Sequence, residues 1–323
     1  IGWNCTSLNR GSLSKMQTMQ ADAYALHETH LSPLNISDRK GSTKDSGYAL
    51  VHGPLMEVRK NTANRNYTPQ GGVACLGDPS CPPRGISPQD EVGHELHITT
   101  RFMHCCYPLQ GSHDHLHVLI YYGISDSTRN PARRKLNEEQ LQLVFDYGKS
   151  LGAVPVIISL DLNQDPSSCG PLCDAINSSF WTDLAIPKAS SRDREPLATY
   201  VEQKWKRDEY EVKSGQTRID LMVVNEVAKF AVKDFREMHE VAFDSRPGTY
   251  PHHVPLRLEL NLDIFKQSGY RLHLCPPLVL DKINNGKERE SGLGRSQVDQ
   301  QEINNERARA FAQANAELKE TLQ

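Results

Sequence analysis

The sequence predicts a layered α/β protein in which two mostly antiparallel sheets pack face to face and helices lie outside them. Two observations support this prediction: apolar segments with strand composition recur through residues 1–262, and few helical segments separate them. The chain of 323 residues, with 37% hydrophobic and 24% charged residues, is also long enough to bury a large core. In such a sandwich we expect the ends of several strands to meet along one rim.

The N-terminal part of the chain supplies the first elements. Residues 1–7, 11–20 and 21–31 are predicted to form a strand, a helix and a second strand. Residues 32–95 are rich in Gly, Pro, Ser and Asn and contain an apolar segment at 71–76. This composition predicts short strands that are joined by long loops.

The clearest predicted strands come later. Residues 116–125 are rich in β-branched and aromatic residues, and residues 154–163 contain the apolar run of a buried strand. A helix is predicted between them at 137–152, because Leu141, Val144 and Phe145 recur at helical spacing before a glycine. Two further strands are predicted at 217–225 and 252–262.

The composition changes near residue 266. We expect residues 1–265 to form one domain, and residues 266–323 to form a polar linker followed by a strongly helix-forming tail. The sequence begins inside a predicted strand and without a methionine. We therefore expect a fragment of a longer product.

Charge and cysteine content narrow the class of protein. A formal net charge of −3 supplies no overall basic field, so binding to nucleic acid would depend on a local patch. No apolar run approaches the roughly 18 residues that cross a bilayer, so no membrane role is expected. The eight cysteines are irregularly spaced, which favours reduced thiols over a zinc site and an intracellular protein, nuclear or cytoplasmic. His113, His115 and His117 occupy alternate positions, and alternating histidines can bind a metal ion. A polar segment that leads into a strand is the favoured explanation.

Polar side chains lie at or near the ends of the predicted strands. A charged group at the end of an apolar strand is costly unless it reaches solvent, a partner or a metal ion. One such residue is usually a solvated strand end, but the pattern recurs on several strands with carboxylate, amide, imidazole and phenol groups. These residues are Asn4, Glu28, Tyr122, Asp161, Asn163, Asp220, His252 and His253.

This set of side chains predicts hydrolysis of a phosphoester. Carboxylate and amide oxygens are the ligands that Mg²⁺ prefers, and a bound divalent ion polarises a phosphoryl oxygen. A carboxylate can orient or deprotonate a water molecule, and imidazole, amide and phenol groups can stabilise the charge that develops on phosphate. Mg²⁺ is the expected cofactor, and Mn²⁺ is the alternative.

Six short motifs in this sequence resemble those of the endonuclease/exonuclease/phosphatase superfamily, also called DNase I-like. They follow in the order of that superfamily and span about residues 1–263, and the resemblance implies a four-layer α/β sandwich. The HETHL segment is most similar to the endonucleases of LINE-type retrotransposons and to exonuclease III-like domains. The six motifs are WN at 3–4, HETHL at 27–31, IYYG at 120–123, LDLN at 160–163, RID at 218–220 and HHVPL at 252–256.

The resemblance also implies roles for individual residues. Glu28 resembles the principal metal ligand, with Asn4 close to the metal ion. Asp161 would position or activate the attacking water, and Asn163 would hold the phosphate or the leaving group. Asp220 resembles an acidic residue near the metal ion or the histidine. His253 resembles a histidine that contacts the scissile phosphate, and Tyr122 resembles a tyrosine that supports it.

Three positions depart from the superfamily pattern. Leu160 stands where glycine is usual, and His27 stands where glutamine is usual. The largest departure is His252, which replaces an aspartate that orients the imidazole or helps to bind the metal ion. Loss of such an orienting group costs about 10- to 100-fold in activity or metal affinity, so reduced activity is expected.

Three functions remain open on the sequence alone. The leading hypothesis is a Mg²⁺-dependent endonuclease that nicks DNA, from a retroelement-like protein in which a reverse transcriptase would follow. The second is a phosphatase or phosphodiesterase that acts on another phosphoester, and the third is a catalytically weakened remnant that serves as a binding module. The basic residues at 130–135 and 204–207 are candidate phosphate contacts, although solvated loop charges explain them equally well.

Overall fold

The computed structural model describes residues 1–55, 71–109, 115–186, 196–206, 209–242 and 253–266. The chain divides into two units, Ile1–Gln267 and Ser268–Gln323, and every described residue belongs to the first unit. Almost all of the predicted linker and tail therefore lies outside the described residues, as does His252.

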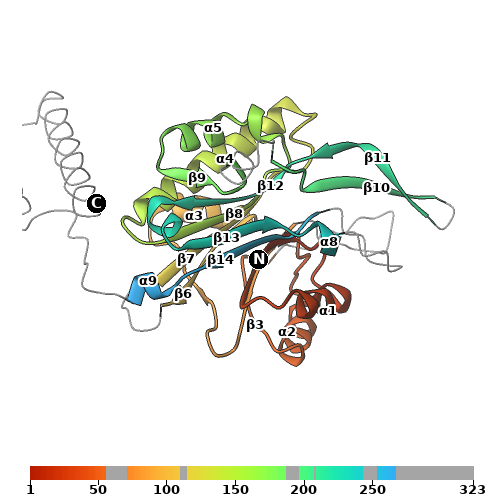
Figure 1. Ribbon diagram of the computed structural model, residues 1–323, viewed down its shortest axis with the longest axis horizontal. Helices are drawn as coiled ribbons and strands as arrows, with labels where there is room; N and C mark the ends of the chain where they lie inside the picture. Colours follow the sequence, from red (N-terminus) through yellow and green to blue (C-terminus); the bar gives the residue numbers. More distant parts are fainter. Residues whose placement is uncertain (56–70, 110–114, 187–195, 207–208, 243–252, 267–323) are drawn as a thin grey trace, which may run out of the picture. The chain divides into compact units, whose positions relative to one another are not determined.

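The first sheet contains six strands in the order β13-β14-β1-β2-β4-β3 (Figure 1). Its central pair, β1 and β2, is parallel, and every other neighbouring pair is antiparallel. The strands are β1 (Gly2–Asn4), β2 (Ala23–His27), β3 (Ala49–His52), β4 (Val73–Gly77), β13 (Val232–Glu237) and β14 (Leu256–Leu260).

The second sheet also contains six strands, in the order β5-β6-β7-β8-β12-β9. Its central pair, β7 and β8, is parallel, and the other pairs are antiparallel. A separate two-stranded sheet, β10 (Tyr200–Lys206) with β11 (Glu209–Thr217), extends beyond the two large sheets (Figure 1). The six strands are β5 (Arg84–Gly85), β6 (Phe102–Pro108), β7 (His115–Tyr122), β8 (Val156–Asp161), β9 (Trp181–Asp183) and β12 (Asp220–Asn225).

Three hydrophobic clusters build the layers. One cluster joins the inner faces of the two sheets and includes Val73, Ile120 and Val224. A second packs α3 (Glu91–Ile98), α4 (Pro131–Ser150) and α5 (Gly170–Asn177) on the outer face of the second sheet. A third packs α1 (Arg10–Met19) on the outer face of the first sheet, beside α2 (Ile36–Asp45). The predicted fold class, an α/β sandwich with two sheets inside and helices outside, is confirmed.

Local sequence explains where the two predicted helices at 11–20 and 137–152 begin. At α1, Asn9 and Ser12 exchange side-chain and backbone hydrogen bonds in a capping box. The helix predicted at 137–152 begins earlier, at Pro131, because the Asn130 side chain accepts hydrogen bonds from the first turn and proline suits the first helical position.

Several elements were missed in the sequence. The stretch 32–95 contains α2, β3 and α3, and not only short strands and loops. Helix α2 has a weakly amphipathic, polar sequence, so its helical periodicity was not visible. Strand β6 has the sequence FMHCCYP and is buried on both faces, so it lacks the alternation of apolar and polar residues that marks a half-buried strand. The remaining missed elements are α5, β9, β10, β11, β13 and the short helices α7 (Glu226–Lys229), α8 (His239–Ala242) and α9 (Asp263–Lys266).

No helix in the described part of the chain is long and apolar enough to cross a membrane.

The predicted histidine cluster is partly described. His117 lies on β7, and its Nδ1 is 2.9 Å from Nε2 of the buried His104 on β6. The hydroxyl of Tyr147 on α4 lies 2.9 Å from Nδ1 of His104. His104, His117 and Tyr147 thus form a hydrogen-bonded network under α4. His115 and His117 lie within β7, and His113 lies outside the described residues.

We expect His104 to make the fold sensitive to acid. Burial, and then the neighbouring His117, lower the pKa of His104 from 6.5 to about 3. The unfolded chain therefore binds a proton as the pH falls below 6.5 while the folded protein does not, so stability decreases progressively toward the folded pKa. For one such group the free energy of unfolding falls by about 2 kcal/mol between neutral pH and pH 5.

Urea unfolding at neutral pH and at pH 5 measures this effect. His104→Gln, which keeps hydrogen-bonding capacity, is expected to show a smaller loss of stability on acidification than the wild-type protein. His94→Gln, at an exposed position of α3, is the matched control and should keep the wild-type loss. An unchanged loss in His104→Gln would contradict the prediction.

Candidate active site

The predicted site residues come from the ends of strands in both sheets. Asn4 ends β1 and pairs with His27, which places Glu28 one residue beyond the neighbouring end of β2. In the second sheet, Tyr122 at the end of β7 and Asp220 at the start of β12 both pair with Asp161 at the end of β8. Parallel pairs bring strand ends to one edge, and an antiparallel strand contributes its beginning to the same edge.

Asn4 connects the two sheets at this edge. Its side-chain Nδ2 donates a hydrogen bond of 2.9 Å to Oε2 of Glu28 and one of 2.7 Å to Oδ2 of Asp161. The orientation of the amide is settled because its Oδ1 accepts a hydrogen bond of 2.9 Å from the backbone N–H of Thr6. The Asn4 amide is therefore buried between two carboxylates that lie far apart in the sequence.

Glu28 lies in a strained turn that neighbouring glycines support. Its φ is +53° and that of His30 is +54°, in the left-handed region that costs non-glycine residues energy. The backbone N–H groups of Thr29 and His30 donate to the carbonyls of Gly72 and Gly71 at 3.1 and 2.9 Å. The paired glycines thus hold the glutamate outside the regular strand.

The carboxylate of Glu28 is stabilised in its charged form. Nε2 of His30 lies 3.4 Å from Oε1, and Asn4 donates to Oε2. Burial favours the neutral acid, but the hydrogen bonds from His30 and Asn4 outweigh it and lower the pKa of Glu28 below its usual value. Glu28 is therefore ionised at neutral pH.

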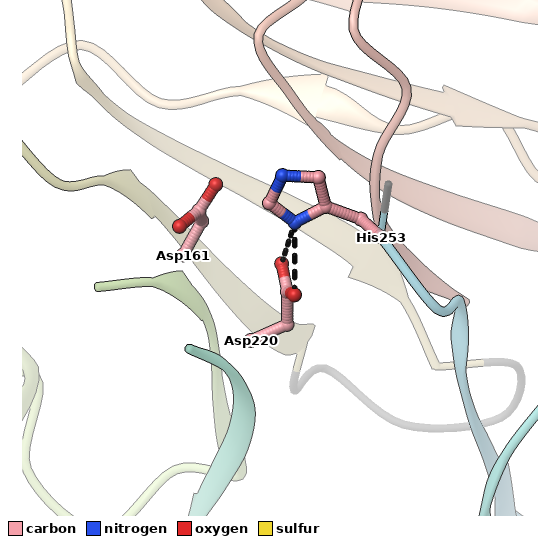
Figure 2. A group of neighbouring side chains, drawn as sticks. All are labelled: Asp161, Asp220 and His253. Carbon is pink, nitrogen blue, oxygen red and sulfur yellow. Dashed lines mark hydrogen bonds and ion pairs between the residues drawn. The ribbon is translucent and has the colours of Figure 1, made fainter. Parts of the chain in front are cut away.

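Asp161, Asp220 and His253 form a compact buried group (Figure 2). Nδ1 of His253 lies 2.9 and 3.1 Å from the two carboxylate oxygens of Asp220, while the carboxylate of Asp161 faces the ring from another side. One ligand atom from each residue lies within 4.8 Å of the other two. Burial opposes the charged imidazole, but the carboxylate of Asp220 outweighs it and raises the pKa of His253 to about 9.

Residues that the sequence reasoning missed hold this group in place. The hydroxyl of Thr199 accepts hydrogen bonds from the backbone N–H groups of Ile219 and Asp220 at 3.0 and 2.8 Å. The Tyr200 ring packs against the His253 ring, with centroids 4.9 Å apart. Nothing in the sequence pattern links residues 199 and 200 to the motifs, since they lie outside them and reach the site through the fold.

The explanation for the proximity of Asp161 and Asn163 needs a correction. The strand predicted at 154–163 would include both residues and place their side chains on one face, because strand side chains alternate with period two. Strand β8 ends at Asp161, however, and Asn163 has a φ of +53°. Their proximity comes from a turn, in which the backbone N–H of Asn163 donates to Oδ1 of Asp161 at 3.1 Å and its Nδ2 donates to the carbonyl of Gly123 at 3.0 Å.

Tyr122 is buried at the same rim. Its hydroxyl lies 3.3 Å from the hydroxyl of Ser125, and burial raises its pKa, so the phenol stays protonated. The guanidinium of Arg101 lies over its ring at 5.0 Å from the centroid. The pairing of Tyr122 with Asp161 in the sheet places this tyrosine beside the other predicted residues.

The residues present fit a hard divalent cation. Three carboxylates, those of Glu28, Asp161 and Asp220, surround the site, and His253 supplies only one compensating charge. Burial, and then the charge of Asp220, raise the pKa of Asp161 to about 7, and a cation bound beside this carboxylate would favour its ionised form. Carboxylate oxygens around excess negative charge are the donor set that Mg²⁺ or Mn²⁺ prefers.

Two of the three positions that differ from the superfamily pattern lie among the described residues. Leu160 lies in the regular ladder opposite Leu221 and is fully buried under the outer helices, so the strand accommodates it without distortion. Nε2 of His27 lies 3.1 Å from the carbonyl oxygen of Ser159, and this contact links the two sheets beside the site. His252 lies outside the described residues.

The basic segment at 130–135 supports a loop at the rim. Arg133 bonds the carbonyl of Ser125 and Arg134 bonds that of Thr128, at 3.1 and 2.9 Å. The Thr128 hydroxyl in turn donates to the carbonyl of Asn163 at 3.1 Å. Both arginines therefore have structural partners in the loop that adjoins Asn163.

Comparison with known proteins shows which solved structures share this fold. No protein-family model and no curated protein sequence matches the chain. Among solved structures, a 3′ phosphatase called NExo from Neisseria, bound to a product DNA hairpin, is similar with a TM-score of 0.58 and 14% identity, over 80% of this chain and 98% of that chain.

Two further structures broaden the comparison. An AP endonuclease from Archaeoglobus fulgidus has a TM-score of 0.55 and 15% identity, over 80% of this chain and 98% of that chain. The endonuclease domain of TRAS1, a telomere-specific non-LTR retrotransposon, has a TM-score of 0.52 and 12% identity, over 80% of this chain and 96% of that chain. The resemblance seen in the motifs is thus confirmed in three dimensions: the chain has the endonuclease/exonuclease/phosphatase fold, also called DNase I-like.

Proposed function

We propose that this protein hydrolyses phosphodiester bonds with a divalent metal ion, and that it acts as a DNA endonuclease of a retroelement-like protein. The observation that carries the proposal is the Asn4 amide, which donates to Glu28 and to Asp161 beside the His253–Asp220 pair. A metal-binding carboxylate, a water-orienting carboxylate and a charged imidazole thus lie at one rim.

The environment of each side chain supports the role that we propose for it in hydrolysis. Glu28, ionised and held by Asn4, would hold the metal ion together with the nearby carboxylates, and the bound ion would polarise a phosphoryl oxygen. Asp161 orients or deprotonates the attacking water. His253 is charged because Asp220 faces its Nδ1, and its Nε2–H donates a hydrogen bond to the scissile phosphate as negative charge develops there. Asn163 contributes its amide, and Tyr122 supports the phosphate from the same rim.

Two alternatives remain, and one has support from the comparisons. A phosphatase that removes a terminal phosphate is favoured by the similarity to the 3′ phosphatase from Neisseria. A binding module without activity is favoured only by the replacement at His252. The endonuclease is preferred because the HETHL segment resembles retrotransposon endonucleases and the TRAS1 domain shares the fold. In a full-length retroelement protein a reverse transcriptase would follow this domain.

Cleavage of supercoiled plasmid DNA tests the proposal. We expect nicked circles in the presence of Mg²⁺ or Mn²⁺, none with EDTA, and none with Glu28→Ala. Glu139→Ala, at an exposed position of α4, is the control and should nick at the wild-type rate. A 3′-phosphorylated oligonucleotide is assayed in parallel: release of phosphate without nicking identifies the phosphatase, and no activity with either substrate at any metal concentration leaves only the binding module.

A further inference from the structure

Arg101 stands outside every motif of the sequence, yet it contacts two residues at the rim. It precedes β6, and its backbone carbonyl accepts a hydrogen bond of 2.8 Å from the backbone N–H of Tyr122. Its side chain turns to the same place: Nη1 donates to the carbonyl of Gly123 at 2.7 Å and more weakly to that of Tyr122 at 3.4 Å. Its guanidinium also covers the Tyr122 ring at 5.0 Å.

Gly123 joins this arginine to the residues that follow β8. Its carbonyl accepts a second hydrogen bond, of 3.0 Å, from Nδ2 of Asn163, and its N–H donates to the carbonyl of Asp161 at 2.6 Å. The approach is so close that a Cβ on Gly123 would lie 2.5 Å from the carbonyl oxygen of Leu162. The Gly123 carbonyl therefore accepts hydrogen bonds from two side chains, those of Arg101 and Asn163.

We propose that Arg101 is a positioning residue, which aligns the Asn163 amide through the Gly123 carbonyl and holds the Tyr122 ring. The inference rests on the proposed function, because it gives these contacts a part in hydrolysis. A charged donor makes a stronger hydrogen bond than a neutral one, so the guanidinium holds the carbonyl in a single place. The Asn163 amide then has one defined direction, with its second N–H available to the phosphate or the leaving group.

Arg101 also has a competing explanation, direct contact with a DNA phosphate. The two explanations differ in what substitution changes. A phosphate contact contributes to binding, so its loss raises KM and reduces the dependence of binding on salt by about one counterion. A positioning contact acts on the geometry of the reaction, so its loss lowers kcat, and misplacement by about 1 Å costs up to 10²-fold.

Single-turnover nicking kinetics of Arg101→Ala, Asn163→Ala and the double variant distinguish the two explanations. We expect kcat of Arg101→Ala to fall by about 10- to 100-fold with KM nearly unchanged. In the Asn163→Ala background, Arg101→Ala should cost much less than it does in the wild-type protein, because the two substitutions interrupt the same connection and only the contact with the Tyr122 ring is lost in addition. Arg101→Lys, which can donate to the carbonyl but cannot reproduce the flat guanidinium over the ring, should fall between Arg101→Ala and the wild-type protein.

Arg84→Ala, at an exposed position of β5 in the same sheet, is the matched control and should leave kcat and KM unchanged. A raised KM with unchanged kcat, or losses that simply multiply in the double variant, would overturn the proposal in favour of a phosphate contact.

A second readout does not depend on activity. The side-chain amide signal of Asn163 in ¹⁵N-resolved NMR spectra, assigned by its loss in Asn163→Ala, should shift in Arg101→Ala and stay in place in Arg84→Ala. An unmoved amide signal in Arg101→Ala would refute the positioning role. If the wild-type protein cleaves no DNA but the amide signal shifts, the proposed function fails while the structural connection stands.

Discussion

Asp161→Asn is expected to lower the rate of DNA nicking by about 10²- to 10⁴-fold, the usual contribution of a group that accepts a proton from the nucleophile. The substitution is nearly isosteric. The asparagine oxygen can accept only one of the two hydrogen bonds that Asp161 now receives, from Asn4 at Oδ2 and from the backbone of Asn163 at Oδ1. The main loss should appear in the chemical step, and the unmatched donor adds a smaller loss of stability.

Single-turnover nicking at saturating DNA measures the effect, and thermal unfolding confirms that the variant is folded. Asp165→Asn is the matched control, because Asp165 belongs to the same segment but is exposed and caps the short helix at Pro166–Ser168. Its rate should equal that of the wild-type protein. Equal rates for Asp161→Asn and wild type would show that this carboxylate takes no part in the reaction.

The second large effect is expected at the buried His253–Asp220 pair. Removing one member of a buried ion pair leaves the other uncompensated, which typically costs about 3–5 kcal/mol of stability. Asp220→Asn should therefore lower the free energy of unfolding by this amount and also abolish most of the nicking activity, because a neutral imidazole stabilises the phosphate charge less well. His253→Gln is expected to lower activity to a similar level.

Urea unfolding and single-turnover kinetics on both single variants and the double variant test this pair. Because both residues act as one unit, the double variant should lose little more activity than either single variant. Asp146→Asn, on the exposed face of α4, is the control for removal of a carboxylate and should leave both measurements unchanged. Activity losses that multiply in the double variant would show that the two side chains act separately.

The strand-end motifs contained most of the information about the site. The sequence indicates Asn4, Glu28, Asp161 and Asp220 because these polar groups interrupt apolar segments. The structure brings all four to one rim. Tyr122 and His253 also lie there. Periodicity failed at Asn163, because a side chain beyond the end of a strand follows the turn and no longer the alternation of the strand.

Elements without a strong periodic signal were out of reach of the sequence. Helix α2 is polar on most sides, and β6 is interrupted by His104 and two cysteines. Their conformations depend on the sheets and helices that they pack against, since tertiary context overrides weak local preference. The same holds for Thr199, which acts on Asp220 through a contact that no short motif encodes.

The sequence by itself determined the fold class, the most apolar strands and the chemical types gathered at the strand ends, because each depends on residues close together in the chain. Only the tertiary structure decided which groups meet. Asn4 and Asp161 are separated by 157 positions, and their hydrogen bond depends on how the two sheets pack. The contact between Arg101 and Asn163 shows the same limit, because it passes through the backbone carbonyl of Gly123. Every residue has the same backbone carbonyl, so a pattern of side chains cannot predict this connection.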